Sequence, residues 1–128
     1  MKDNVVIDRS YALALKIVRL YLSLKDNKKE FELSRQILKS GTSVAANIEE
    51  AVGAQSEKDF LAKVGIAYKE CRETIFWLKL LRDSELIEKE QAQELMADMD
   101  ELIRIIGTIK KTMTLKLHPN SSLSTPPH

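Results

Sequence analysis

The chain has 128 residues, of which 44% are hydrophobic and 30% are charged. Its net charge is +1, from 20 basic and 19 acidic residues, and this balance argues against an obligate polyanion binder. The length suits one domain with one core. Because Cys71 is the single cysteine, an intramolecular disulfide is excluded. Since neither a signal-peptide core nor a membrane-length apolar run is present, we expect a soluble, cytoplasmic protein with no membrane partner.

The first predicted helix runs from about residues 3–8 to about Lys25 and carries apolar residues on two sides. At about 100° per residue, one stripe comprises Leu13, Ile17, Leu20 and Leu24. The second stripe, on nearly the opposite side, comprises Tyr11, Leu15, Val18 and Leu22. A helix inside its own bundle needs one apolar stripe, so the second predicts a contact with another subunit. The alternative is a central helix in an irregular monomer.

The second predicted helix, from about Glu30 to Val52, follows a short polar link that makes it an antiparallel neighbour. Two adjacent rows form its predicted packing surface: Phe31, Leu38, Ala45 and Val52, and Ile37, Val44 and Ala51. The small residues of segment 41–47 predict close packing, and a buried Asn47 would need hydrogen-bond partners. Gly53 is well placed to end the helix in a left-handed cap.

The third predicted helix begins at Ser56, whose hydroxyl can cap free backbone N–H groups. Its inward stripe is Phe60, Val64, Ala67, Cys71, Thr74, Leu78 and Leu81. Ile66 and Trp77 project from this stripe on one side, and Phe76 and Leu80 on another. Such a quartet suggests a partner surface. The alternative is that Trp77 lies across a neighbouring helix.

The fourth predicted helix runs from about Glu88 to Leu115. Its single stripe is Leu95, Met99, Leu102, Ile106, Ile109 and Met113. Three lysines, Lys110, Lys111 and Lys116, suit the dipole at the helix end, and a nucleic-acid patch is the alternative interpretation. The sequence therefore predicts an all-α, antiparallel up-down-up-down four-helix bundle over residues 1–116, followed by a flexible C-terminal tail over residues 117–128.

Few catalytic chemistries suit this sequence. Both histidines, His118 and His128, lie in the predicted tail, so no helix offers a histidine for a zinc site, a di-iron site or a catalytic triad. The four glycines are too scattered for a phosphate-binding loop. The carboxylates of the middle helices, Glu49, Glu50, Glu70 and Glu73, are typical of solvated faces and ion pairs. We therefore expect no enzyme activity, cofactor, metal or small-molecule substrate.

Several short motifs resemble the ribosomal-RNA intervening-sequence protein family, also called four-helix bundle proteins. They are Ser10-Tyr11-Ala12-Leu13, Leu33-Ser34-x-Gln36-Ile37-Leu38-x-Ser40-Gly41-Thr42-Ser43, Ala46-Asn47-Ile48-x-Glu50-Ala51, Ser56-x-x-Asp59-Phe60 and Trp77-Leu78. The resemblance covers roughly residues 8–110. It implies an antiparallel bundle that commonly forms a ring-like homopentamer. Ala45 stands where many members have proline, which should leave the second helix straighter.

The resemblance leads to two functional hypotheses. The first is a non-enzymatic oligomeric scaffold or adaptor that contacts RNA or a protein partner. Its structural and oligomerisation motif would be Ser43, Asn47, Glu50, Asp59, Phe60 and Trp77. Here Asn47 would bond Ser43 or a neighbouring helix, and Glu50 would anchor a contact between helices or subunits. The second is an RNA- or DNA-binding accessory protein, as in a strongly basic retroelement branch of the family. Its contacts would be a face repeated around a pentamer: Lys16, Arg19, Lys25, Lys28 and Lys29.

Overall fold

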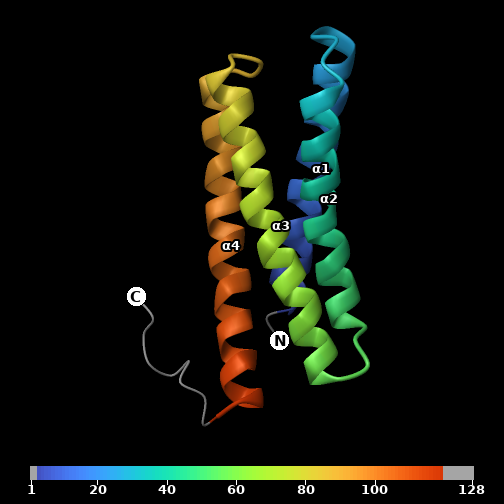
Figure 1. Ribbon diagram of the computed structural model, residues 1–128, viewed down its shortest axis with the longest axis vertical. Helices are drawn as coiled ribbons and strands as arrows, with labels where there is room; N and C mark the ends of the chain where they lie inside the picture. Colours follow the sequence, from blue (N-terminus) through green and yellow to red (C-terminus); the bar gives the residue numbers. More distant parts are fainter. Residues whose placement is uncertain (1–2, 120–128) are drawn as a thin grey trace.

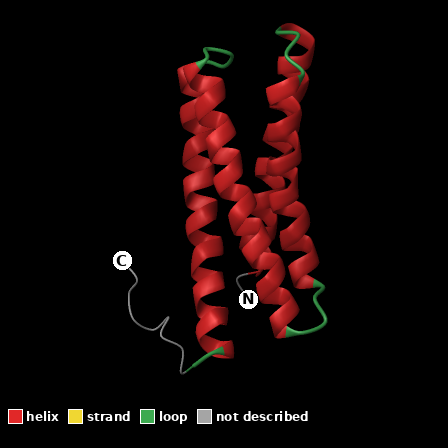
Figure 2. Ribbon diagram, viewed as in Figure 1, coloured by secondary structure: helices red, strands yellow, loops and turns green. Residues whose placement is uncertain are grey.

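The computed structural model describes residues 3–119, in which four long helices are joined by short loops (Figure 2). The helices are α1 (Asp3–Asn27), α2 (Glu32–Val52), α3 (Glu57–Asp83) and α4 (Lys89–Leu117). No strand occurs in these residues, so the prediction of an all-α fold is confirmed. None of the four described helices is long and apolar enough to cross a membrane.

Side-chain contacts show the relative direction of the helices. Arg9 of α1 pairs with Glu101 of α4, whereas Lys16, seven residues further along α1, pairs with Glu94, seven residues earlier in α4. The first and last helices therefore run in opposite directions. Figure 1 shows the same alternation throughout, because the chain ascends α1, descends α2, ascends α3 and descends α4.

Side chains cap the start of two helices. The Glu30 carboxylate accepts hydrogen bonds from the backbone N–H groups of Glu32, Leu33 and Ser34, at 2.8–3.1 Å. It thereby satisfies three donors that have no partner within the first turn of α2. At α3, the Ser56 hydroxyl accepts a hydrogen bond from the Asp59 N–H at 3.0 Å, as the sequence predicts.

The end of α2 at Gly53 differs from the prediction. This glycine has φ −89°, so it does not form a left-handed cap. The chain instead continues the helical turn, in which the Ala54 N–H donates to the Ala51 carbonyl at 3.1 Å. Left-handed conformations occur at Lys29 and Glu85, with φ of 55° and 63°, where the chain turns sharply into the next helix.

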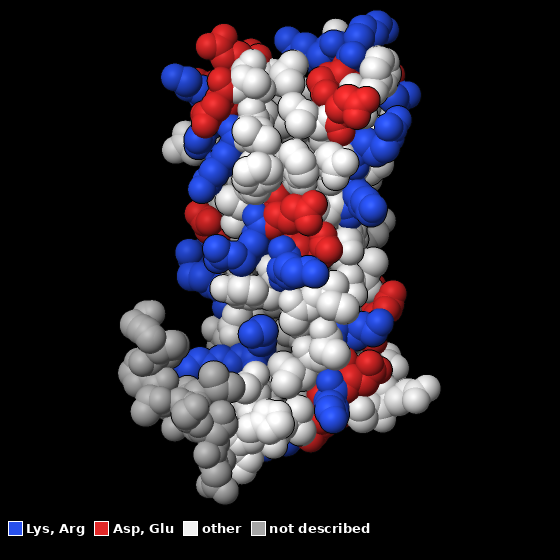
Figure 3. All heavy atoms as spheres, viewed as in Figure 1, with Lys and Arg blue, Asp and Glu red and all other residues white. Residues whose placement is uncertain are grey.

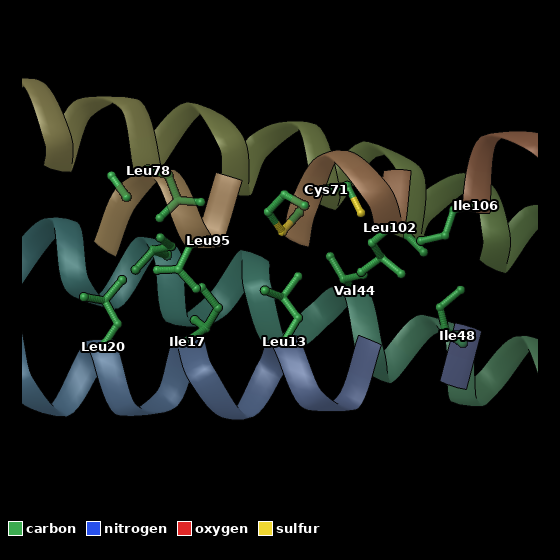
Figure 4. Close-up of a cluster of buried hydrophobic side chains, with 14 of the residues drawn as sticks. Leu13, Ile17, Leu20, Val44, Ile48, Cys71, Leu78, Leu95, Leu102 and Ile106 are labelled. Atoms are coloured by element: carbon green, nitrogen blue, oxygen red, sulfur yellow. The ribbon is translucent and has the colours of Figure 1, made fainter. Parts of the chain in front are cut away.

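All four helices contribute to one apolar core (Figure 4). Its fully buried members include Ile17 of α1, Val44 of α2, Leu78 of α3 and Met99 of α4. The predicted inward stripes of α1 and α3 are confirmed as buried, except that Phe60 is only partly buried. In the predicted row of α2, Ala45 is buried and Leu38 is half-buried, but the prediction is wrong for the two end residues, Phe31 and Val52, which are each 47% exposed.

The C-terminal end of α4 extends beyond α1. Because Arg9 lies opposite Glu101 and the two helices are antiparallel, the first described residue of α1 lies opposite about residue 107 of α4. Ile109 and Met113 are consequently only half-buried, although the sequence places them in the inward stripe. The helix continues to Leu117, two residues beyond its predicted end, and the remainder of the predicted tail, residues 120–128, lies outside the described residues.

Candidate interaction surfaces

The second apolar stripe of α1 lies on the outside of the bundle. Tyr11, Leu15 and Leu22 are 64%, 39% and 45% exposed, and Val18 is half-buried. These residues lie about 160° around the helix from the buried stripe, at about 100° per residue. Tyr11, Leu15 and Leu22 remain exposed beside the described helices, so α1 presents an apolar surface to whatever surrounds the chain.

A second exposed apolar surface lies on α3. Phe76 is 52% exposed, and Ile66 and Leu80 are each 39% exposed. Trp77 is half-buried, and its ring packs edge-on against Phe76 with centroids 5.0 Å apart. The indole N–H of Trp77 donates to Glu73 Oε2 at 3.1 Å, one turn earlier on α3. Trp77 therefore packs along its own helix and partly against the core.

Asn47 and Ser43 form a local pair on α2. The Asn47 Nδ2 group donates to the Ser43 carbonyl oxygen at 2.8 Å and to the Ser43 hydroxyl at 3.1 Å. Both side chains are half-buried. Of the two alternatives open from the sequence, the structure thus places Asn47 in contact with Ser43 rather than with another helix.

Glu50 connects two helices through an ion pair. Its Oε1 atom lies 2.8 Å from the Nζ atom of Lys63 on α3. The hydrogen bond with Glu50 raises the pKa of the Lys63 ammonium above its ordinary value. About one turn before Lys63, Asp59 and Phe60 lie in the first turn of α3, where the Phe60 N–H donates to the Ser56 carbonyl at 2.9 Å.

Sequence reasoning missed the buried polar link between α2 and α3. The Ser40 and Thr74 hydroxyls are 2.9 Å apart and share a hydrogen bond, and both residues are buried. The Thr74 hydroxyl also lies 2.8 Å from the Glu70 carbonyl oxygen. Two features of the sequence could have indicated this link. Thr74 lies on the predicted inward stripe of α3, and Ser40 directly precedes the small-residue segment of α2.

The basic residues of α1 are not a free basic face. The Lys16 ammonium lies 2.7 Å from Asp98 and 3.1 Å from Glu94, and these hydrogen bonds raise its pKa. Lys25 lies 3.4 Å from Asp26. Arg19 is exposed, and Lys28 and Lys29 occupy the α1–α2 loop. The structure therefore brings Lys16 to α4 and leaves three of the five predicted contacts without a carboxylate partner among the described side chains.

The carboxylates and the cysteine do not form a catalytic cluster. Desolvation raises the pKa of Glu70, with a further contribution from the neighbouring Glu73 carboxylate. Burial raises the pKa of the Cys71 thiol to about 12, and Glu70 adds to that increase. Within residues 3–119, no three Asp, Glu, His or Cys side chains are placed to hold a metal ion.

These features define a four-helix bundle protein with apolar residues exposed on α1 and α3. The chain belongs to the 23S rRNA-intervening sequence protein family, whose sequence profile matches residues 2–108. The structure is similar to a crystal structure of a protein of unknown function from the S23 ribosomal protein family of Bacteroides thetaiotaomicron. The two share 49% sequence identity and a TM-score of 0.85, over 87% of this chain and 99% of that one. Comparison with curated proteins gives no significant match.

Proposed function

We propose that the chain is a non-enzymatic scaffold whose copies assemble through the exposed faces of α1 and α3. The observation that carries this proposal is the stripe of Tyr11, Leu15 and Leu22, which lies outside the core although every member is large and apolar. Contiguous exposed apolar surface of this kind usually marks a contact with another protein. We take the partner that covers the α1 stripe to be a second copy of the same chain. Each copy also exposes apolar residues on α3, which can pack against the α1 stripe of its neighbour.

The two faces lie on different helices and consist of different residues. A contact between α1 of one copy and α3 of the next is head-to-tail, and such contacts close into a ring when the rotation between copies divides a full turn. The homopentamer implied by the family resemblance is one ring of this kind. In each copy, α1 would cover the Phe76 and Leu80 surface of its neighbour.

A scaffold role agrees with the chemistry of the described side chains. Cys71 is buried, and its high pKa keeps the thiol protonated at neutral pH, so it is not a nucleophile. His118 is exposed at the C-terminal end of α4, where its backbone N–H donates to the Thr114 carbonyl. The polar residues Asn47 and Glu50 support helix geometry and the α2–α3 contact.

The test is the mass of the purified full chain by native mass spectrometry. We expect a multiple of the monomer mass, with a fivefold mass for the pentamer. A variant with Leu15→Glu and Leu22→Glu should dissociate to monomers, because two carboxylates would be buried in the contact. The control, Ala97→Glu, adds a carboxylate at an exposed position of α4 and should leave the mass unchanged. A monomeric wild-type chain, or an unchanged mass for the α1 variant, would overturn the proposal.

A further inference from the structure

Two acidic residues interrupt the exposed apolar surface of α3. Ile66, Glu70, Glu73 and Trp77 follow one another at spacings of 4, 3 and 4 residues, so they form one row along the helix, which we call the acidic row. Its two ends are apolar and its middle is acidic. Leu80 lies seven residues after Glu73, so the row borders the surface that the proposed contact covers.

The two carboxylates of the acidic row are held in place by their own chain. Glu70 lies seven residues after Lys63 and four before Thr74, and both of these residues bond to α2, so Glu70 lies on the side of α3 that borders α2. Its side chain is half-buried. Glu73 accepts the indole N–H of Trp77 at Oε2, and no donor among residues 3–119 occupies its Oε1.

Both carboxylates lack a close cation. Desolvation raises the pKa of Glu70 and repulsion from Glu73 adds to the increase, and these effects outweigh the opposite influence of Lys69 and Lys39. In Figure 3, which has α3 in front, Asp and Glu atoms near the middle of the visible face have Lys and Arg atoms beside them. Among residues 3–119, however, no Lys or Arg nitrogen lies within 4.0 Å of either carboxylate. The acidic row can therefore accept a cation from outside the chain.

Arg19 is the matching cation on α1. Three of the four basic residues within α1 lie within 4.0 Å of a carboxylate: Arg9, Lys16 and Lys25. Arg19 has no such partner among the described side chains, and it is exposed. It lies one turn after Leu15 and one turn before Leu22. The apolar stripe of α1 therefore also has a charge near its middle, and that charge is positive.

The stripe of α1 and the acidic row have the same length. Tyr11 and Leu22 are 11 residues apart, and so are Ile66 and Trp77. This spacing is about 16 Å along a helix at 1.5 Å per residue. Both rows have apolar ends, so a contact that pairs the ends also brings the two charged middles together.

This match holds whether the two helices run parallel or antiparallel. Arg19 lies eight residues from the start of its stripe. Eight residues from the N-terminal end of the acidic row is residue 74, next to Glu73. Eight residues from its C-terminal end is residue 69, next to Glu70. In each direction, Arg19 meets a carboxylate when the apolar ends are paired.

We propose that Arg19 of one copy binds the Glu70 and Glu73 carboxylates of the next copy, where α1 packs against α3. The proposal rests on the assembly proposed above and adds the charged groups that select the partner. A guanidinium group carries several N–H donors in one plane and forms paired hydrogen bonds with carboxylates. Complementary charges inside an apolar contact fix which residues meet and disfavour other partners. A basic segment of another protein would neutralise the carboxylates but would not supply apolar ends at the same spacing.

The test is sedimentation velocity of the full chain over a range of concentrations, with native mass spectrometry for the stoichiometry. Arg19→Glu should raise the concentration of half-dissociation at least tenfold, because it places a third carboxylate against two others. The triple variant Arg19→Glu, Glu70→Lys and Glu73→Lys reverses the charge on both sides and should return to within threefold of the wild type. Arg104→Glu, which reverses an exposed arginine of α4, is the matched control and should leave the assembly unchanged.

The outcomes separate this contact from the assembly itself. A monomeric wild-type chain would overturn the proposed assembly and the ion pair with it. An assembled wild type whose Arg19→Glu variant dissociates no more readily than Arg104→Glu would overturn the ion pair alone. A folded triple variant that dissociates as readily as Arg19→Glu would also overturn it, since the loss would then not come from the pairing of charges.

A neutral set of variants covers a triple variant that loses helical circular dichroism, since Glu73 also accepts the Trp77 indole N–H. The set comprises Arg19→Gln, the pair Glu70→Gln and Glu73→Gln, and their combination, in which the glutamine at position 73 keeps an acceptor for Trp77. If the groups touch across the contact, the combined variant should lose less affinity than the product of the two separate losses. A combined loss equal to that product would overturn the ion pair.

Discussion

Gly41 of α2 lies directly against Ile17 of α1. A Cβ atom at Gly41 would lie 2.9 Å from two side-chain carbons of Ile17, closer than carbon atoms can pack. Both residues are buried, and Ile17 is fully inaccessible to solvent. The small-residue segment of α2 therefore does what the sequence predicts, because it lets α1 approach closely, and the residue it accommodates is a β-branched side chain with little rotamer freedom.

Replacing Gly41 with alanine should destabilise the chain, despite the higher helix propensity of alanine. The added methyl group overlaps Ile17, and overpacking of a filled core costs about 1–3 kcal/mol. Gly53→Ala is the control, because its Cβ would meet only the Glu50 carbonyl oxygen at 3.9 Å and its φ of −89° suits any residue. Urea unfolding followed by circular dichroism should show a lower midpoint for Gly41→Ala alone. Equal midpoints for the two variants would contradict the close packing.

The buried Ser40–Thr74 pair leads to a second prediction. Thr74→Val removes one hydroxyl and leaves the Ser40 hydroxyl with a weak alternative, the Ile37 carbonyl oxygen at 3.4 Å. An unsatisfied buried polar group costs about 1–3 kcal/mol, so the single variant should be destabilised by that amount. The double variant Ser40→Ala/Thr74→Val should lose less than the sum of the two single variants. Additive losses in urea unfolding would mean that the two hydroxyls are not coupled.

Much of the fold could be predicted because the apolar residues of α1, α3 and α4 recur at helical spacing. The stripe of Leu13, Ile17 and Leu20 and the stripe of Leu95 and Met99 are both buried as predicted. The Ser56 cap was also predictable, because one serine before an acidic first turn is a strong local signal.

Other features depend on how the helices are placed relative to one another, which the spacing of apolar residues along a single helix does not reveal. The two candidate core rows of α2 differ by one residue in register, so only packing shows that Ile37 is buried and Phe31 is exposed. Lys16 has no acidic partner near it in the sequence, since Asp98 is on α4. The Glu30 cap was missed for a local reason: a carboxylate that turns back onto three N–H groups needs the sharp turn at Lys29.

Burial of Cys71 predicts slow thiol chemistry. The folded pKa of about 12 exceeds the value of about 8.5 for an exposed thiol. Since the folded state holds the proton more tightly, stability from this group is fully present below about pH 8.5 and decreases as the pH rises towards 12. At pH 8, a thiol reagent such as iodoacetamide should modify the native chain far more slowly than the chain in 8 M urea. Equal rates would show that Cys71 is accessible in the folded state.

Asn47 and Glu50 should differ in what their replacement changes. Because Asn47 bonds Ser43 on its own helix and no other side chain or carbonyl among residues 3–119, Asn47→Ala should leave the chain folded and lower its stability by about 1 kcal/mol or less. Glu50→Gln removes the charge that pairs with Lys63 across two helices, at an exposed site where such pairs contribute about 0–1 kcal/mol. The loss of stability caused by Glu50→Gln should therefore be smaller at high salt, whereas the loss caused by Asn47→Ala should not depend on salt.

Urea unfolding at low and high salt measures both effects, and native mass spectrometry shows whether either variant dissociates. An Asn47→Ala chain that stays folded and yet separates into monomers would mean that Asn47 contacts a second copy. In that case its hydrogen bonds with Ser43 would orient the amide for the contact between copies, and the polar residues of α2 would belong to the assembly surface together with α1 and α3.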